Sequence, residues 1–246
     1  MIEKMSTSST NSITVYCSTF NSIKWIEGYL ENINSQDCEP FDLFFIDANS
    51  TDGSLEKIKS FKFQDHISVS IFEPGNLSIY AAWNYAVKKS HTPYVMNFNT
   101  DDRLGRYSLS LYQDLIKEYP DVDLFYGIHH FVSEIGGDNL PIGSYWQNLI
   151  RKLLSISEET LMFTINPCGP FPLTKKSSLL KAGEFDEKYF SSADYDMWLR
   201  MFSMGMKFMR VNKYIGDFLY RPDSTSQSRL KECEAHDKEI QLKYAS

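Results

Sequence analysis

The chain has 246 residues, of which 42% are hydrophobic, and a formal net charge of −7 at pH 7. This length and this apolar fraction predict one folded unit with a substantial core and exclude a largely disordered chain. The negative charge argues against nucleic acid as the main partner, and no apolar run approaches the roughly 20 residues that a membrane-spanning helix needs.

The polar start of the chain, MIEKMSTSSTNS, lacks the apolar core of a secretory signal. It predicts a disordered tail over residues 1–11 and a cytoplasmic protein. The cysteines lie far apart and include no CxxC pair, so they indicate neither a zinc site nor a disulfide framework. They are Cys17, Cys38, Cys168 and Cys233.

Strand and helix patterns alternate through the first half of the chain. β-branched and aromatic residues predict strands at residues 12–20, 41–47, 66–73 and 94–98. Apolar residues at helical spacing predict helices between them, at residues 23–33, 50–61 (after a turn) and 79–87. Such alternation predicts a mostly parallel central sheet flanked by helices.

Three carboxylates stand where strands of this sheet are expected to end. Asp47 ends the second strand, and Asp101 and Asp102 follow the fourth. Ligands of such sheets bind beyond the carboxyl ends of the strands, so these three side chains are expected along one rim. Adjacent carboxylates repel each other unless a cation or solvent separates them. The pair therefore either caps the next helix, around residues 109–116, or holds a metal.

The second half contains GEFDEKYFSSADYDMWLRMFSMG, which places Asp194 at the start of a helix that ends at Gly205. A carboxylate there is either a helix cap or a functional group. Asp196 faces another side of this helix. A charged pattern at residues 231–246 predicts a C-terminal helix.

Four segments occur in the order and rough spacing of family 2 glycosyltransferases with the GT-A fold: SITVYCSTFN, IDANSTDGS, IYAAWNYAV followed by YVMNFNTDD, and GEFDEKYFSSADYDMWLRM. The resemblance runs from about Ser12 to about Gly205. It implies an α/β fold of GT-A type, with a mostly parallel central sheet flanked by helices and a Rossmann-like nucleotide-binding half joined to an acceptor-binding half. The expected domain spans residues 12–230, with the donor half at about 12–125 and the acceptor half at about 126–230.

The resemblance also implies an activity and its cofactor. Members transfer a sugar from a nucleotide diphosphate sugar to an acceptor hydroxyl, usually with Mn²⁺ or Mg²⁺. By similarity, Asp102 is the metal ligand and Asp101 faces the ribose or sugar of the donor. The metal would act as a Lewis acid on the departing diphosphate oxygen.

Other donor-binding residues are implied in the same way. Ser18, Phe20 and Asp47 match positions that contact the base, and Asn84 is assigned to the donor site. Packing at the strand end is an equally good interpretation of Phe20. The chain departs from many relatives at Ala48, and from some relatives at Ala81, where they carry Asp.

Asp194 matches the general base that takes the proton from the acceptor hydroxyl, in a direct displacement that inverts the sugar. His129 and His130 are either near the metal or structural. Arg221 and Arg229 lie in a polar loop that either meets the diphosphate or stays in solvent.

The sequence therefore predicts an inverting, metal-dependent glycosyltransferase of bacterial surface polysaccharide or glycolipid synthesis. Its acceptor is a soluble or lipid-linked saccharide, and the latter would be met at the inner face of the membrane through peripheral contact. The alternative is a non-catalytic nucleotide-sugar binding or scaffold protein. A sugar nucleotidyltransferase is disfavoured because CSTFN, after the first strand, contains no glycine.

Overall fold

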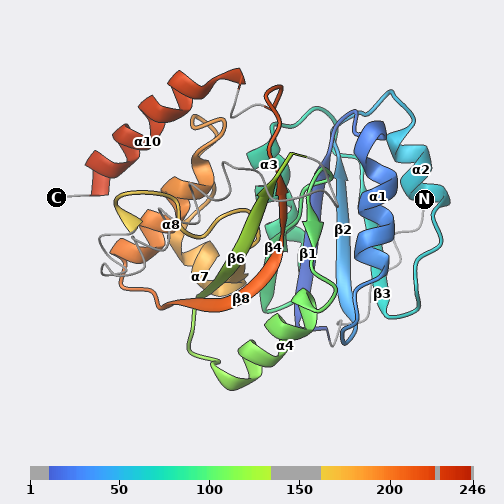
Figure 1. Cartoon of the computed structure of the whole chain (residues 1–246), viewed down its shortest axis with the longest axis horizontal. Coiled ribbons are helices and arrows are strands. Elements are labelled where there is room, and N and C mark those ends of the chain that lie inside the picture. Colours follow the sequence, from blue (N-terminus) through green and yellow to red (C-terminus); the bar gives the residue numbers. More distant parts are fainter. Residues whose placement is uncertain (1–10, 134–161, 225–227, 245–246) are drawn as a thin grey trace.

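The computed structural model describes residues 11–133, 162–224 and 228–244 (Figure 1). The predicted tail, residues 1–11, lies outside the described residues except for Asn11.

The elements of residues 11–133 are β1 (Ile13–Thr19), α1 (Ile23–Asn34), β2 (Phe41–Asp47), α2 (Ser54–Ser60), β3 (Ile67–Phe72), α3 (Ile79–Lys89), β4 (Tyr94–Asn97), β5 (Arg103–Leu104), α4 (Ser108–Glu118) and β6 (Leu124–Val132). Those of residues 162–224 and 228–244 are β7 (Leu173–Lys175), α7 (Lys176–Ala182), α8 (Ala193–Ser203), β8 (Phe208–Leu219) and α10 (Leu230–Tyr244).

One sheet runs through the described parts of the chain, in the strand order β3-β2-β1-β4-β7-β6-β8-β5. Strands β3, β2, β1 and β4 are parallel, as the alternating pattern predicted. Beyond β4 the directions mix, because β7 is antiparallel to both β4 and β6, whereas β6 and β8 are parallel to each other. The predicted α/β fold of GT-A type is therefore confirmed, with a mixed second half.

Helices cover both faces of the sheet, giving three layers (Figure 1). On one face, α1, α2 and α4 pack in one core cluster with alternate residues of β1 such as Val15 and Cys17. On the other face, α3, α7 and α8 pack with Tyr16, Phe44 and Ile46. Alternate strand residues point to opposite faces, so a sheet covered on both faces needs the nearly continuous apolar strands seen in the sequence.

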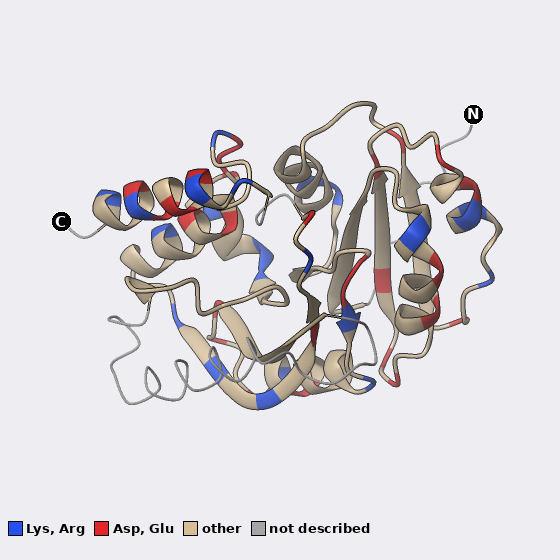
Figure 2. Cartoon of the chain, turned by 45° about the horizontal axis from the view of Figure 1, so that its top comes forward, with Lys and Arg blue, Asp and Glu red and all other residues tan. Residues whose placement is uncertain are grey.

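The helix at the C-terminal end of the described residues, α10, carries interleaved charges of both signs (Figure 2). It contacts α8 through Asp196, whose fully buried carboxylate accepts hydrogen bonds from Arg200 (2.6 Å), Lys243 (2.8 Å) and Tyr244 (3.0 Å). Asp196 thus attaches α10 to α8.

Two details of the fold bear on the candidate site residues. His129 and His130 lie inside β6, which continues to Val132. Asp101 and Asp102 do not cap α4, whose N-cap residue is Tyr107. Among the described residues, no helix is both long and apolar enough to cross a lipid bilayer.

Candidate functional site

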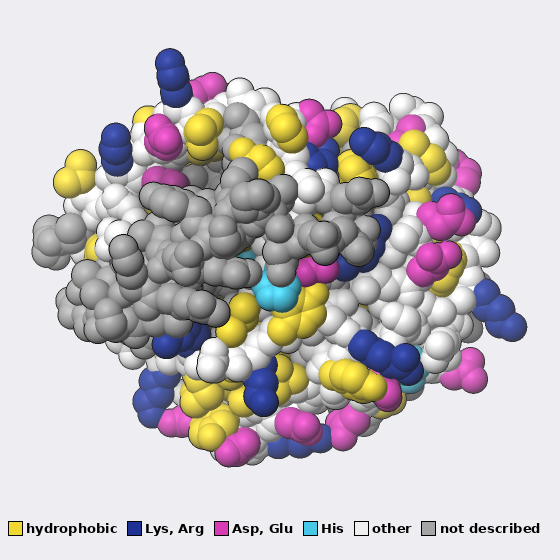
Figure 3. Space-filling view, viewed as in Figure 1, with side chains coloured by type: hydrophobic (Ala, Val, Ile, Leu, Met, Phe, Trp, Pro, Cys, Tyr) yellow, Lys and Arg dark blue, Asp and Glu magenta, His cyan; other side chains and the backbone are white. Residues whose placement is uncertain are grey.

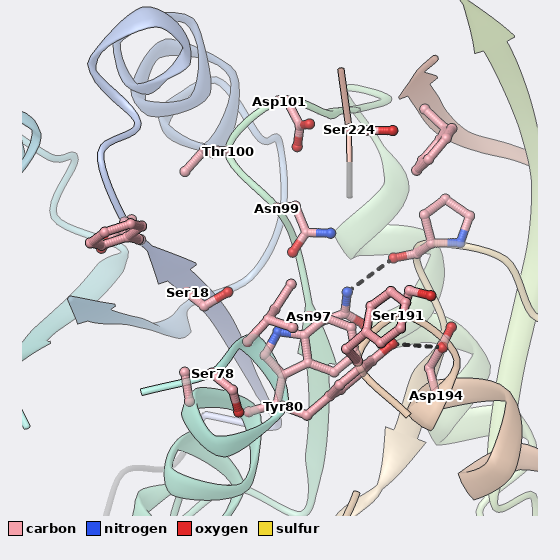
Figure 4. Close-up of a pocket in the computed structure, with 18 of the residues that line it drawn as sticks. Ser18, Ser78, Tyr80, Asn97, Asn99, Thr100, Asp101, Ser191, Asp194 and Ser224 are labelled. Carbon is pink, nitrogen blue, oxygen red and sulfur yellow. Dashed lines mark hydrogen bonds between the residues drawn. The ribbon is translucent and has the colours of Figure 1, made fainter. Parts of the chain in front are cut away.

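A pocket of about 770 Å³ opens beyond the carboxyl ends of β1, β2 and β4 (Figure 4). The loop after β1 contributes Ser18 and Phe20 to its wall, and the loop after β4 contributes Asn99 and Asp101. The start of α3 and the start of α8, which carries Asp194, also line it, together with parts of β6, the loop at residues 166–170 and the segment at residues 218–224. The pocket lies at the edge of the sheet where the parallel topology predicts a ligand site.

The loops after β1 and β2 are fixed to each other. Asn21 and Asn49 adopt the left-handed conformation, with φ of 48° and 62°. Asn21 donates its backbone N–H to the Ser50 hydroxyl (3.0 Å) and accepts the backbone N–H of Thr51 (2.9 Å). Asn tolerates this conformation better than most residues, which explains its presence at both turns.

The residues that we predicted to contact the nucleotide base separate into two groups. Ser18 and Phe20 line the pocket, and the Phe20 ring is 62% exposed, so it is not packed at the strand end. Asp47 is buried outside the lining, and its carboxylate accepts hydrogen bonds from the Thr19 hydroxyl (3.1 Å) and the Ser50 N–H (2.9 Å). Asp47 therefore shapes the loop, while its neighbour Ala48 lines the pocket.

The paired aspartates occupy different environments. Asp101 lines the pocket, and its Oδ2 accepts two hydrogen bonds from Arg221, from Nη2 at 2.7 Å and Nε at 3.1 Å. Asp102 is 1% exposed and points away from the lining, where its Oδ1 accepts the backbone N–H of Leu219 at 3.0 Å. Burial and the adjacent Asp101 carboxylate raise the pKa of Asp102 well above its usual value. This placement does not support Asp102 as the metal ligand, because Asp101 is the carboxylate that faces the pocket.

The pocket that Asp101 lines also contains ligands that suit a divalent cation. Asn99 and His129 line the same pocket, and burial, followed by the neighbouring His130, lowers the pKa of His129 to about 4, so its imidazole is neutral and able to coordinate. Among the described residues, no group of three or more His, Cys, Asp or Glu side chains is arranged so that it could hold a metal ion by itself. Mg²⁺ commonly binds through one or two carboxylates plus substrate phosphates, so this set fits a cation shared with a diphosphate.

Gly169 allows a close approach to His129 in this pocket. Its φ of +63° lies in the left-handed region, and an added Cβ would stand 2.5 Å from Cε1 of His129. The loop at residues 166–171 can therefore contact His129 only with glycine at this position.

Asp194 is fixed from two sides. Its Oδ1 accepts a hydrogen bond from the Tyr80 hydroxyl on α3, and its Oδ2 accepts one from Nδ2 of Asn166, both at 2.9 Å. Burial raises the pKa of Asp194 to about 6, although both hydrogen bonds act to lower it. Neither contact is a helix-capping contact, and the N-cap residue of α8 is Ser192. A carboxylate with such a pKa can accept a proton near neutral pH.

Asn84 does not belong to the pocket lining, contrary to the sequence expectation. Its side chain donates to the carbonyl oxygen of Phe185 (3.0 Å) and accepts the N–H of the same residue (2.8 Å). This pair of hydrogen bonds attaches α3 to the segment before α8. Ala81 also lies outside the lining.

Sequence reasoning assigned no role to Tyr80 or to Asn166. Both side-chain donors to Asp194 lie far from it along the chain, by 114 and 28 residues. Asn97, at the end of β4, also lines the pocket and donates to the carbonyl oxygen of Pro170 (3.3 Å) (Figure 4). In sequence, the only signal for Tyr80 and Asn97 was their proximity to the ends of predicted elements, and Asn166 had no such signal.

On the face shown in Figure 3, Lys and Arg are interspersed with Asp and Glu across the described residues. Among the exposed hydrophobic side chains, Ile128 lies on β6, Tyr214 lies on β8, and Tyr107 is the N-cap residue of α4. The pocket is therefore the feature that we interpret as functional.

Comparison with known proteins places these features in a family. The family model described as Glycosyl transferase family 2 matches residues 14–179. An uncharacterized glycosyltransferase of Methanocaldococcus jannaschii is 25% identical over 223 residues, which make up 89% of this chain and 74% of that protein. The hyaluronan synthase of Pasteurella multocida is also 25% identical over 223 residues, but the match spans only 21% of its length.

The fold has counterparts among solved structures. A mannosyltransferase from Pyrobaculum calidifontis, solved in complex with GDP-mannose and Mn²⁺, superposes with a TM-score of 0.68 at 17% identity. The superposition covers 90% of this chain and 60% of the mannosyltransferase. At this identity the likeness concerns the fold alone.

Proposed function

Since this chain belongs to glycosyl transferase family 2, we propose that it transfers a sugar from a nucleotide diphosphate sugar to an acceptor hydroxyl, with inversion. One observation carries the proposal. Asp101 and Asp194 line a single pocket (Figure 4). The carboxylate of Asp101 accepts hydrogen bonds from Arg221, and that of Asp194 accepts one from Asn166. A metal-dependent transferase of this kind needs a carboxylate that holds the cation beside the diphosphate, and a general base beside the acceptor hydroxyl.

The chemistry divides between the two carboxylates. The acceptor oxygen forms a bond to the anomeric carbon while the bond from that carbon to the diphosphate oxygen breaks. The nucleotide diphosphate leaves with the bonding electron pair, and the acceptor proton passes to Asp194. Attack opposite the leaving group inverts the anomeric configuration. The exposed Phe20 ring and the Ser18 hydroxyl are proposed to contact the nucleotide.

The proposed cofactor is Mn²⁺ or Mg²⁺, held by Asp101, with Asn99 and His129 as further candidate ligands in the same pocket. When bound, such a cation neutralises charge on the departing diphosphate. This assignment replaces the role first given to Asp102. The complex of the mannosyltransferase with GDP-mannose and Mn²⁺ supports a divalent cation in this fold.

The proposed setting is the synthesis of a bacterial surface polysaccharide or glycolipid, in the cytoplasm or at the inner face of the membrane. The relation to a hyaluronan synthase supports a saccharide acceptor, either soluble or lipid-linked. Because the match spans a small part of that enzyme, the whole activity of the synthase is not carried over.

Thermal unfolding with nucleotides tests the donor site. UDP, GDP, UDP-glucose, UDP-N-acetylglucosamine and GDP-mannose would each be added with Mn²⁺ or with EDTA. A ligand at 100 times its Kd stabilises the native state by about 2.7 kcal/mol. We expect one nucleotide family to stabilise the wild type only with Mn²⁺, and Asp101→Asn to abolish that gain. Stabilisation of neither protein by any nucleotide would contradict the proposal.

A non-catalytic nucleotide-sugar binding protein is the second candidate, because Ala48 lines the pocket where many relatives are expected to carry a carboxylate. The two candidates differ in product formation. Release of nucleotide diphosphate from the bound donor, lost in Asp194→Asn, supports the enzyme. Binding with no release supports the second candidate.

A further inference from the structure

The amide of Asn166 is oriented by the carboxylate of Asp194. An ionised carboxylate only accepts hydrogen bonds, so Asn166 must turn its NH₂ group toward it. The opposite end, Oδ1, is then buried without a partner. Leaving a buried carbonyl oxygen without a hydrogen bond is unfavourable. The side chain of Asn166 nevertheless keeps this orientation, so its hydrogen bond to Asp194 outweighs the hydrogen bond that Oδ1 lacks.

The loop that carries Asn166 is attached to its surroundings on both sides of this residue. Before it, the carbonyl oxygen of Met162 accepts the Tyr195 hydroxyl at 2.7 Å. After it, the carbonyl oxygen of Pro170 accepts Nδ2 of Asn97, and that of Phe171 accepts the Tyr112 hydroxyl at 2.6 Å. These contacts restrict the motion of Asn166 relative to the pocket.

Tyr80 is equally constrained on the opposite side. Its ring packs against Trp83 and Phe185, with centroids 5.0 Å and 5.9 Å away. Ser78 and Tyr80 both line the pocket from α3, and the Ser78 hydroxyl donates to Glu187 at 2.6 Å. Each oxygen of Asp194 thus has one side-chain donor, Tyr80 on α3 for Oδ1 and Asn166 for Oδ2, and the backbone N–H of Tyr195 also donates to this carboxylate.

We infer that Tyr80 and Asn166 are positioning residues that hold the carboxylate of Asp194 in the orientation in which it accepts the acceptor proton. The inference rests on the proposed function, since it requires Asp194 to be the base. Catalytic groups act efficiently only when neighbouring contacts fix their geometry. Neither residue needs to touch the reacting atoms.

The pH dependence of the reaction separates this role from a structural one. The groups that face Asp194 are Tyr80 on α3, Asn166, the backbone N–H of Tyr195 and, through charge, Asp237 on α10 and Tyr16 on β1. The two side-chain donors stabilise the ionised form and lower its pKa, whereas burial and Asp237 raise it. Removing a donor therefore moves the acidic limb of the rate profile to higher pH.

The donor for this experiment is the one among UDP-glucose, UDP-N-acetylglucosamine and GDP-mannose that stabilises the wild type against thermal unfolding. Release of nucleotide diphosphate from this donor is measured between pH 5 and 9. We expect Tyr80→Phe and Asn166→Ala to lose about threefold in kcat at pH 6.5 and about ninefold at pH 5, because raising a pKa of about 6 by one unit lowers the ionised fraction of Asp194 by about those factors. The loss should shrink above pH 8, and donor affinity should stay within about twofold. Asn166→Asp should shift the limb further, because it adds a like charge beside Asp194.

Tyr195→Phe is the matched control. It removes a hydroxyl that anchors the same loop at Met162 without donating to Asp194. The inference is supported if the acidic limb of the pH–rate profile moves to higher pH in Tyr80→Phe and Asn166→Ala but stays in place in Tyr195→Phe. Profiles parallel to the wild type in Tyr80→Phe and Asn166→Ala, or an equal shift in Tyr195→Phe, would overturn it. Full activity of Asp194→Asn would instead contradict the proposed function.

Discussion

Arg221 and Asp101 form an ion pair at the edge of the pocket, with Nη2 of Arg221 2.7 Å from Oδ2 of Asp101. The guanidinium also lies over the ring of Trp25, with its central carbon 5.1 Å from the ring centroid. The carboxylate that we assign to the metal and the diphosphate is therefore already neutralised by a side chain. A divalent cation at Asp101 has to compete with Arg221 for the charge of this carboxylate.

This competition predicts a gain of metal binding when the arginine is removed. In Arg221→Ala, Mn²⁺ alone should raise Tm more than it does in the wild type, because Asp101 is left next to Asp102 without a counter-charge. In EDTA the variant should be less stable by about 1 kcal/mol, the value of a partly exposed ion pair. Lys207→Ala removes an exposed ion pair with Asp121 and is the control. An equal response to Mn²⁺ in all three proteins would exclude the competition.

The two aspartates should respond differently to substitution. Asp101→Asn is expected to remove metal-dependent stabilisation by nucleotide while leaving the unliganded protein folded. Asp102→Ala leaves the buried N–H of Leu219 without its acceptor, which should cost about 1 to 3 kcal/mol of unfolding free energy. Asp102→Asn keeps an acceptor and should cost less. Urea denaturation combined with nucleotide titration distinguishes them, and the roles would be reversed if Asp102→Asn alone lost the metal effect.

The strands and the rim of the sheet could be predicted because their signals are local. Apolar alternation is read from neighbouring residues, and it correctly located β1 to β4 and the loop after β4. Which of two adjacent carboxylates faces the pocket depends on contacts with residues far along the chain. Asp102 turns inward to Leu219, and Asp101 pairs with Arg221, 120 residues away. Neither contact has a local signature.

The contacts of Asn84 were hidden from sequence for a similar reason. A polar residue in a helix beside a predicted site is naturally assigned to the ligand, whereas here its partner is the backbone of Phe185, 101 residues further on. Asp194 was located by its motif. Its two side-chain donors come from separate elements, so a single sequence could not associate them with it.

Asn84→Ala tests this revised role directly. It leaves the N–H and the carbonyl group of Phe185 without side-chain partners in a buried position, so the unfolding free energy should fall by about 2 to 4 kcal/mol. Nucleotide affinity, measured by calorimetry below the melting range, should change by less than about twofold. A large loss of affinity with little loss of stability would restore Asn84 to the donor site.

Asp194 and Asp196 should give opposite stability changes as pH rises, although both lie in the first turn of α8. The pKa of Asp194 in the folded protein is raised from 3.8 to about 6, chiefly by burial. Its stabilising contribution is therefore fully present below about pH 4 and is lost as the pH rises through about 6. Burial also acts to raise the pKa of Asp196, but Lys243 and Arg200 lower it overall, so the contribution of Asp196 is lost as pH falls.

The variants Asp194→Asn and Asp196→Asn turn this difference into a measurement. At pH 8, Asp194→Asn should be more stable than the wild type by up to about 3 kcal/mol, the free energy of two pKa units, and the gain should vanish near pH 4. Asp196→Asn should be less stable at pH 8, because it leaves Lys243 and Arg200 without their buried counter-charge. Urea denaturation at both pH values checks the two signs. A stability gain of Asp194→Asn that is equal at pH 4 and pH 8 would show that its carboxyl group does not carry the raised pKa that a base acting near neutrality requires.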